Sequence, residues 1–330
     1  MSRIAVIGDG GWGTALAISA ARAGAGVSLW SAFPDYAAEF CASRENTKFL
    51  PGVSVPEEIA ITSDAAAALD GAELVISAVP TQFVRETVGR IAECLPADCT
   101  LASASKGLER GTLLRPSEIL SEVTGCGSIA VLSGPSHAEE VARGLPASIV
   151  AAAEREEVAG KVQSLMIGPA LRIYTSTDVA GVELGAALKN VIALAAGCAD
   201  GLELGDNAKA ALITRGIVEL ARLGGALGAR SETFWGLSGL GDLVVTCASR
   251  HSRNRGVGER LGRGETLERI LESTEKVAEG VPTTEAVLQL AAQRGVELPI
   301  AEAVGRVLAG CSPREEVTKL MSRAAKAEID

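Results

Sequence analysis

Three glycines near the N-terminus constrain the fold of this chain more than any other feature. In RIAVIGDGGWG (3–13) a short apolar run leads into Gly8, Gly10 and Gly13, which have the spacing G-x-G-x-x-G. An Ala-rich stretch and a second apolar run, Val27–Trp30, follow. This order predicts a strand, a tight turn, a helix and a second strand. In such a unit the glycines make the turn, let the backbone approach a pyrophosphate and allow the helix to pack on the strand, so the sequence predicts a dinucleotide site.

Apolar runs of strand length alternate with helical patterns through the first half of the chain. The predicted strands are Arg3–Ile7, Val27–Trp30, Glu73–Val79, Thr100–Ala104, Ser128–Leu132, Ala147–Ala152 and Leu171–Tyr174. This alternation predicts a mainly parallel, doubly wound sheet of the Rossmann type. Ligands of such sheets bind at the carboxyl ends of the strands. Lys106 and the segment 134–136 follow two of these strands, so we expect them near a ligand, although Lys106 could also be a solvated loop lysine.

Strand patterns end near residue 178. Long Ala/Leu-rich helical patterns cover 178–198, 207–227 and 283–294. The predicted fold class is therefore α/β, with a Rossmann-type doubly wound sheet followed by an all-α C-terminal domain. We expect a dinucleotide-binding domain over residues 1–178 and a helical substrate domain over 179–330, and a chain of 330 residues is long enough for two domains.

One lysine stands alone in an apolar helical pattern. Lys189 is the only charged residue between Glu183 and Asp200, and Asn190 follows it. Burying an ammonium group is costly unless the group has a partner or a task. Either the long side chain reaches solvent, or Lys189 is an acid–base group in a cleft between the two domains.

Two polar stretches follow in the helical half. GLSGLGDLVVT (236–246) places Asp242 next to glycines, and RHSRNR (250–255) holds three arginines. Arginine offers a rigid fork of donors that suits a phosphate or a carboxylate. A solvated helix start is the alternative reading of the arginines.

Composition excludes several classes of function. The net charge of −10 argues against a nucleic-acid surface, and two histidines without a ligand cluster argue against a dedicated metal site. No uninterrupted apolar run reaches the ~20 residues of a membrane span, and the stretch around Lys189 is short, glycine-rich and charged. Seven cysteines without a C-x-x-C pair predict reduced, mostly buried thiols. A strand that begins at Arg3 leaves no room for a signal peptide, so we expect a cytoplasmic protein.

The choice between NAD and NADP stays open. NAD-specific folds place Asp or Glu at the end of the second strand, where it binds the ribose 2′-hydroxyl. This chain has Ser31-Ala32-Phe33 there, without a nearby arginine for a 2′-phosphate. Asp35 comes after Pro34 and is expected to begin a helix.

Together these motifs resemble the bacterial-type NAD(P)-dependent glycerol-3-phosphate dehydrogenase family over the whole chain. The resemblance is carried by GDGGWGTALA (8–17), SKGLE (105–109), SGPSHAEEVARGLP (133–146), GAALKNVIALAAG (185–197), ITRGIVELARLGGALGA (213–229), GLSGLGDLVVTC (236–247), SRNR (252–255) and VAEG (277–280). It implies reversible hydride transfer between NAD(P)H and dihydroxyacetone phosphate, giving sn-glycerol 3-phosphate for glycerophospholipid synthesis. It also implies a small phosphorylated substrate and NAD or NADP as cofactor. We expect a homodimer, although the sequence does not establish the oligomeric state.

The resemblance further implies a role for individual residues. Lys189 corresponds to the proton donor and acceptor. The substrate positions are Lys106, Gly134, Ser136, Lys189, Asn190, Asp242, Thr246, Ser252, Arg253 and Asn254. The cofactor positions are Gly8, Gly10, Gly11, Trp12, Gly13, Phe83, Lys106, Ala138, Arg253, Val277 and Glu279.

This chain departs from many relatives at two cofactor positions. Gly11 replaces a serine, a change we expect to be small because the backbone donor remains. Ala32 replaces an arginine or histidine, which removes a partner for a 2′-phosphate and argues against a strict NADP preference.

Two other functions fit part of the pattern. A hydroxy-acid or sugar-acid dehydrogenase of similar architecture could use the same arginines for a carboxylate. A non-catalytic dinucleotide sensor could use the same glycine turn, although it has no need of Lys189. The sequence leaves the oligomeric state, feedback regulation and the physiological direction open.

Overall fold

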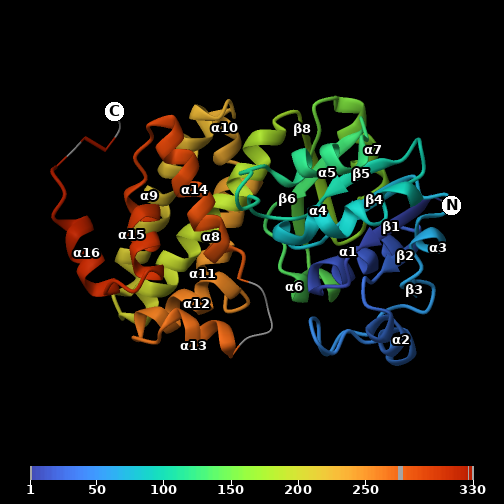
Figure 1. Ribbon diagram of the computed structural model, residues 1–330, viewed down its shortest axis with the longest axis horizontal. Coiled ribbons are helices and arrows are strands. Elements are labelled where there is room, and N and C mark those ends of the chain that lie inside the picture. The colour runs from blue at the N-terminus through green and yellow to red at the C-terminus, as the bar shows by residue number, and fades with distance from the viewer. Residues whose placement is uncertain (1, 274–277, 326, 329–330) are drawn as a thin grey trace.

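The computed structural model describes residues 2–273, 278–325 and 327–328. Figure 1 shows two halves side by side: a sheet covered by helices on both faces, and a bundle of helices. The sheet half ends with strand β8 at Ser176, and the long helix α8 (Val179–Gly201) begins the helical half. The division at residues 178 and 179 stays a prediction.

The described residues form an eight-stranded sheet in the order β3-β2-β1-β4-β5-β6-β7-β8. Neighbouring strands are parallel except β6 and β7, which are antiparallel. The strands are β1 (Arg3–Ile7), β2 (Gly26–Trp30), β3 (Ala60–Thr62), β4 (Leu74–Ser77), β5 (Thr100–Ser103), β6 (Ile129–Ser133), β7 (Ala147–Ala152) and β8 (Leu171–Ser176). The predicted doubly wound sheet is confirmed. The short edge strand β3 was missing from the prediction, because three residues carry no readable alternation.

The helices that flank the sheet are α1 (Gly11–Arg22), α2 (Pro34–Ser43), α3 (Ala65–Leu69), α4 (Thr81–Gly89), α5 (Pro116–Thr124), α6 (Ala138–Ala142) and α7 (Glu156–Met166). Helix α1 directly follows the glycine turn. Gly24, just beyond its end, has φ +90°, the left-handed conformation that ends many helices. Helix α2 begins at Pro34, so Asp35 lies in its first turn.

The helical half packs around α8. Its other elements are α9 (Gly205–Ala226), α10 (Ser231–Phe234), the π-helical turn η2 (Leu237–Gly241), α11 (Asp242–Ala248), α12 (Arg253–Gly262), α13 (Leu267–Glu272), α14 (Gly280–Arg294), α15 (Pro299–Leu308) and α16 (Pro313–Met321). Asp178 caps the start of α8, because its carboxylate accepts a hydrogen bond from Gly181 N at 3.0 Å.

Helix α8 is long and apolar enough to cross a membrane by length and composition alone. It has 23 residues and a mean hydropathy of 1.5, so the expectation that this stretch is too short was wrong. Within the protein, however, 83% of its most apolar window is buried. Packing against the surrounding helices therefore accounts for its apolar character.

Glycines allow α8 and α12 to touch through their backbones. A Cβ atom on Gly197 would lie 2.0 Å from Arg255 O, and one on Gly258 would lie 2.0 Å from Leu194 O. Any larger residue at either position would push the helices apart. This contact holds α12, which carries two predicted substrate residues and is capped by a third, against the helix that carries Lys189.

The cysteines are less buried than expected. All seven are free thiols: three are buried, two are half-buried, and Cys41 and Cys311 are exposed. The exposed pair lies on helix α2 and just before helix α16. A predominantly buried set was therefore a wrong prediction, whereas free thiols were expected.

Candidate active site

The glycine turn leaves room for a dinucleotide. Gly8 has φ +103°, and a Cβ atom on Gly13 would lie 1.9 Å from Gly8 O, so both positions require glycine. Gly10 precedes α1, and no side chain of the described residues caps this helix. Its first N–H groups can therefore bind an anion, as a pyrophosphate site requires. The indole nitrogen of Trp12 is also buried without a hydrogen-bond partner in the described chain.

Gly11 is more constrained than expected. A Cβ atom there would lie 2.8 Å from Phe49 O and 3.8 Å from the Cβ of Ala138. A serine at this position would force the backbone near Phe49 to move, so the difference from relatives is not small in this chain. Ala138, another predicted cofactor residue, lies beside the glycine turn at the start of α6.

Lys189 points into a buried polar cluster. Its Nζ lies 2.5 Å from Asp242 Oδ1 and donates to Thr246 Oγ1 at 2.9 Å. Lys189 is only 5% exposed and Asp242 only 1%. The reading in which Lys189 reaches solvent is therefore wrong. Further substrate candidates around this cluster come from the loops at the carboxyl ends of the strands.

Lys106 joins the sheet to the same carboxylate. It follows β5, and its Nζ donates to Asp242 Oδ2 at 2.8 Å and to Gly134 O at 3.1 Å. Ser136 Oγ also donates to Gly134 O, at 2.9 Å. Asn190 Nδ2 lies 3.4 Å from Lys106 O. Lys106 is thus part of the cluster and not a solvated loop lysine, and these substrate candidates lie together at the carboxyl ends of β5 and β6.

Burial and the neighbouring charges shift the pKa values of the lysine and the carboxylate in this cluster. Burial lowers the pKa of Lys189 to about 7; Asp242 opposes this shift and Lys106 adds to it. Burial alone would raise the pKa of Asp242, but the two ammonium groups hold it below its ordinary value. An ionised carboxylate between two lysines keeps both in place. Near neutral pH, Lys189 can therefore either give or take a proton.

The start of α12 lies against the Lys189 helix. The side chain of Ser252 caps this helix by accepting a hydrogen bond from Arg255 N at 3.2 Å. Asn254 Oδ1 accepts from Gly280 N at 2.9 Å, and a Cβ atom on Gly280 would lie 2.7 Å from Asn190 O. Asn254 and Asn190 therefore meet at Gly280.

The arginines of the basic stretch have different surroundings. Arg253, the first residue of α12, is exposed. Arg255 pairs with Asp200 at 2.6 Å and with Glu259 at 3.3 Å. Carboxylates therefore hold Arg255 within the helical half, whereas the exposed position of Arg253 at the start of α12 makes it accessible to an anionic ligand.

The remaining cofactor candidates lie where the two halves meet. Glu279 Oε1 accepts hydrogen bonds from Thr81 N at 3.1 Å and from Thr81 Oγ1 at 3.2 Å. This contact ties the region before α14 to the start of α4, which also carries Phe83, a half-exposed aromatic residue. Thr81 was missed from the sequence, although it follows β4 at the ligand-binding edge of the sheet. Val277 lies outside the described residues.

Two histidines connect the substrate segments. The rings of His137 and His251 have centroids 5.8 Å apart. His137 follows Ser136 and His251 precedes Ser252, so the loop after β6 lies beside the start of α12. Burial and the charge of Lys189 lower the pKa of His137. Both residues were considered only as metal ligands, although each is next to a predicted substrate position.

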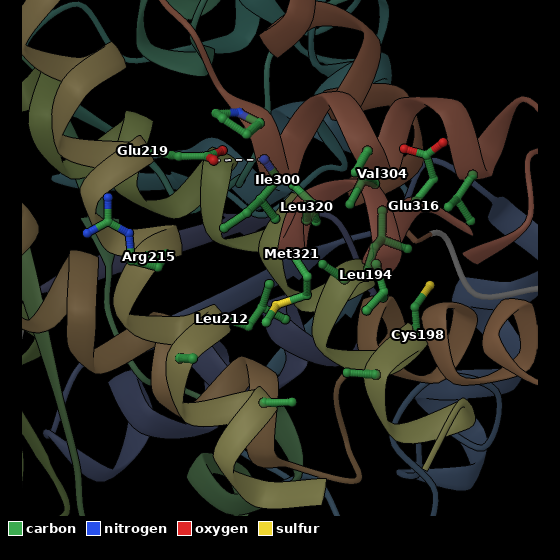
Figure 2. A pocket seen from close by; sticks show the side chains of 18 of the residues that line it. Leu194, Cys198, Leu212, Arg215, Glu219, Ile300, Val304, Glu316, Leu320 and Met321 are labelled. Carbon is green, nitrogen blue, oxygen red and sulfur yellow. Dashed lines mark hydrogen bonds between the residues drawn. The ribbon is translucent and has the colours of Figure 1, made fainter. Parts of the chain in front are cut away.

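An apolar hollow of the helical half lies apart from the Lys189 cluster. It has a volume of about 370 Å³ and lies among α8, α9, α15 and α16 (Figure 2). Its walls are mainly apolar, and one of its buried carboxylates, Glu219, accepts a hydrogen bond from Ile300 N at 2.7 Å. Of the predicted site residues that the structure describes, none lines it. The chemistry therefore belongs to the Lys189 cluster, which combines an acid–base group with the cofactor fold.

Two family models match this chain. Residues 3–159 match the N-terminal part of NAD-dependent glycerol-3-phosphate dehydrogenase, and residues 178–319 match its C-terminal part. The chain belongs to this family. Membership confirms the predicted glycerol-3-phosphate dehydrogenase resemblance, the oxidoreductase class and NAD or NADP as the cofactor.

Relatives of known name share the whole length of the chain. A glycerol-3-phosphate dehydrogenase [NAD(P)+] from Geobacillus kaustophilus is 48% identical, covering 100% of this chain and 97% of the relative. A protein of the same name from Corynebacterium glutamicum is 47% identical, with 99% and 100% covered.

Solved structures agree with this relationship. The glycerol-3-phosphate dehydrogenase of Coxiella burnetii has a TM-score of 0.93 and 37% identity, covering 98% of this chain and 99% of that one. A ketopantoate reductase of the PanE/ApbA family from Ralstonia eutropha has a TM-score of 0.62 and 13% identity, with 96% and 99% covered. The second likeness shows the fold alone. This reductase thus shares an architecture with the chain, whereas family membership separates the chain from the rival hydroxy-acid dehydrogenases.

Proposed function

We propose that this chain catalyses reversible hydride transfer between NAD(P)H and dihydroxyacetone phosphate, giving sn-glycerol 3-phosphate. Family membership and the names of its full-length relatives support this reaction. The observation that carries it is the buried Lys189 beside Asp242 and Lys106, with Lys106 at the same carboxyl edge of the sheet as a glycine turn that fits a dinucleotide. Supply of glycerophospholipid precursors is the corresponding role in metabolism.

The proton comes from the protein. When bound, the nicotinamide supplies the hydride. In the reducing direction, Lys189 donates its proton to the ketone oxygen at C2 while that carbon gains the hydride, which yields the alcohol. In the oxidising direction neutral Lys189 accepts the hydroxyl proton. A pKa of about 7 suits both directions, and Asp242 holds the ammonium group in one orientation.

The phosphate of the substrate needs a separate anchor. Arg253 is an exposed cation at the start of α12, between the capping Ser252 and the buried Asn254. A phosphate held there would benefit from the positive end of the helix dipole as well as from the guanidinium. Binding energy from this remote group would orient the ketone toward Lys189.

A spectrophotometric assay tests this function directly. Dihydroxyacetone phosphate is compared with unphosphorylated keto acids, each with NADH and with NADPH. Oxidation of a reduced cofactor only with the phosphorylated ketone supports the proposal. Turnover only with keto acids would instead support a hydroxy-acid dehydrogenase, and no turnover with any substrate would support a dinucleotide sensor.

We also propose a cytoplasmic homodimer without a membrane span. The free cysteines suit a reducing compartment, and the burial of α8 accounts for its hydropathy without a bilayer. Met321, which is 82% exposed beside the apolar hollow of Figure 2, suits a contact between subunits. Light scattering of the purified protein should give twice the chain mass of 33.7 kDa. A mass of one chain at micromolar concentration would contradict the dimer.

A further inference from the structure

A buried carboxylate in the glycine turn has no part in the chemistry above. Asp9 lies between Gly8 and Gly10 and is 7% exposed. Its Oδ2 accepts a hydrogen bond from Ser31 Oγ at 2.6 Å. Burying a carboxylate is costly, so its place in the turn requires an explanation.

Asp9 lies where dinucleotide folds recognise the adenosine ribose. Strands β1 and β2 are parallel neighbours with Ile7 opposite Trp30, so the residues after both strands share one edge of the sheet. The acid that binds the ribose hydroxyls usually follows the second strand. Ser31 occupies that position in this chain, and its hydroxyl holds the carboxylate of Asp9 instead.

The surroundings hold Asp9 firmly in place. Asn46 Nδ2 donates to Asp9 O at 2.7 Å and to Thr14 Oγ1 at 2.7 Å, so the turn is tied to the start of α1. Burial raises the pKa of Asp9, while the hydrogen bond from Ser31 and the positive charge of Lys48 act in the opposite direction. The carboxylate thus has one oxygen engaged by Ser31 and little freedom to turn away.

Asp35 is the other acid near this edge. Asp35 is the first acidic residue after β2 in the sequence, but it lies in the first turn of α2 and is exposed. An exposed carboxylate on a helix surface keeps its hydration shell and therefore needs no ligand to stabilise its charge. Asp35 is therefore a matched control for Asp9.

We infer that Asp9, positioned by Ser31, binds the 2′-hydroxyl of the adenosine ribose and makes the protein prefer NAD(H) to NADP(H). A carboxylate accepts hydrogen bonds from ribose hydroxyls, whereas a 2′-phosphate would bring a second negative charge against it. Ala32, the residue after Ser31, has no positive charge that would compensate for this repulsion. The inference rests on the proposed function only in that the chain binds one of these two cofactors.

Fluorescence titration without substrate measures this preference apart from catalysis. NADH and NADPH are titrated separately into the full-length protein and into Asp9→Asn, Ser31→Ala and Asp35→Asn. We expect the unaltered protein to bind NADH at least about tenfold more tightly than NADPH. Asp9→Asn should reduce that ratio by roughly 10- to 100-fold, the loss expected for a hydrogen bond to a charged group. Ser31→Ala should reduce it less, and Asp35→Asn should leave it unchanged.

Equal or tighter binding of NADPH by the unaltered protein would overturn the inference. An unchanged ratio of NADH to NADPH affinity in Ser31→Ala would also overturn it, because this variant keeps the carboxylate and removes only one hydroxyl. If Asp9→Asn does not fold, the result for Ser31→Ala decides the test. Equal changes of the affinity ratio in Asp9→Asn and Asp35→Asn would show that only the net charge of the protein matters, which would also refute the inference. Selective NADH binding without turnover of dihydroxyacetone phosphate would refute the proposed function and leave this inference standing.

Discussion

Replacing Lys106 with methionine should move the pH at which the reduction of dihydroxyacetone phosphate slows. Lys106 Nζ lies 2.8 Å from one oxygen of Asp242, and Lys189 Nζ lies 2.5 Å from the other. One carboxylate thus separates the two ammonium groups. Lys106 helps to lower the pKa of Lys189 to about 7, so loss of its charge should raise that pKa. The remaining carboxylate then stabilises protonated Lys189 alone.

The geometry sets the size of this shift. Two ammonium groups roughly 6 Å apart across one carboxylate repel each other by about 2.8 kcal/mol at an effective dielectric constant of 20. This energy corresponds to about two pH units. Because the side chain of Lys106 is 15% exposed, solvent screens part of the repulsion. We therefore expect the pKa of Lys189 to rise by about one to two units.

The assay is kcat/KM for reduction as a function of pH, from about pH 5.5 to 9.5. In the unaltered protein kcat/KM should fall as the pH rises above about 7, because Lys189 loses the proton that it must donate. In Lys106→Met the fall should begin one to two units higher, on a lower absolute rate because a substrate contact is lost. Lys106→Arg keeps the positive charge and should keep the fall near its original pH. A fall that stays in place in Lys106→Met, or moves to lower pH, would refute the electrostatic account.

Three further substitutions test the other contacts. Asp242→Asn removes the charge that supports protonated Lys189, so the fall in kcat/KM should move below pH 7, and an unmoved profile would contradict this pairing. Arg253→Ala should mainly raise KM for dihydroxyacetone phosphate, whereas unchanged KM and kcat would exclude it as the phosphate anchor. Glu183→Ala should lower the free energy of unfolding in urea by about 3 kcal/mol, because Arg115 loses a buried partner 3.0 Å away. A loss below about 1 kcal/mol would show that this ion pair contributes little.

The sheet was predictable because most of its strands are apolar runs with clear breaks. Ala147–Ala152 has the same bounds in the prediction and in the structure. The edge strand β3 was not predictable, because its three residues have no alternating pattern of their own. They form a strand by pairing with β2. The burial of α8 could be expected from its apolar residues, but the helices that cover it could not.

The residue types of the site were readable, whereas their contacts were not. Lys106 and Asp242 are 136 residues apart in the chain, and their ion pair depends on how the helical half packs against the sheet. The resemblance to a family placed both residues in one site without giving that geometry. The hydrogen bond between Asp9 and Ser31 was missed because it depends on the parallel register of β1 and β2, which no local pattern encodes.

The turnover of Lys189→Ala tests the central claim most directly. We expect kcat for the reduction of dihydroxyacetone phosphate to fall by at least ~10²-fold, the lower end for a lost acid–base group, while the affinity for NADH measured by fluorescence stays unchanged. Lys319→Ala, which removes an exposed lysine of α16, should leave both quantities unchanged. Near-normal turnover in Lys189→Ala would contradict the assignment of Lys189 as the proton donor.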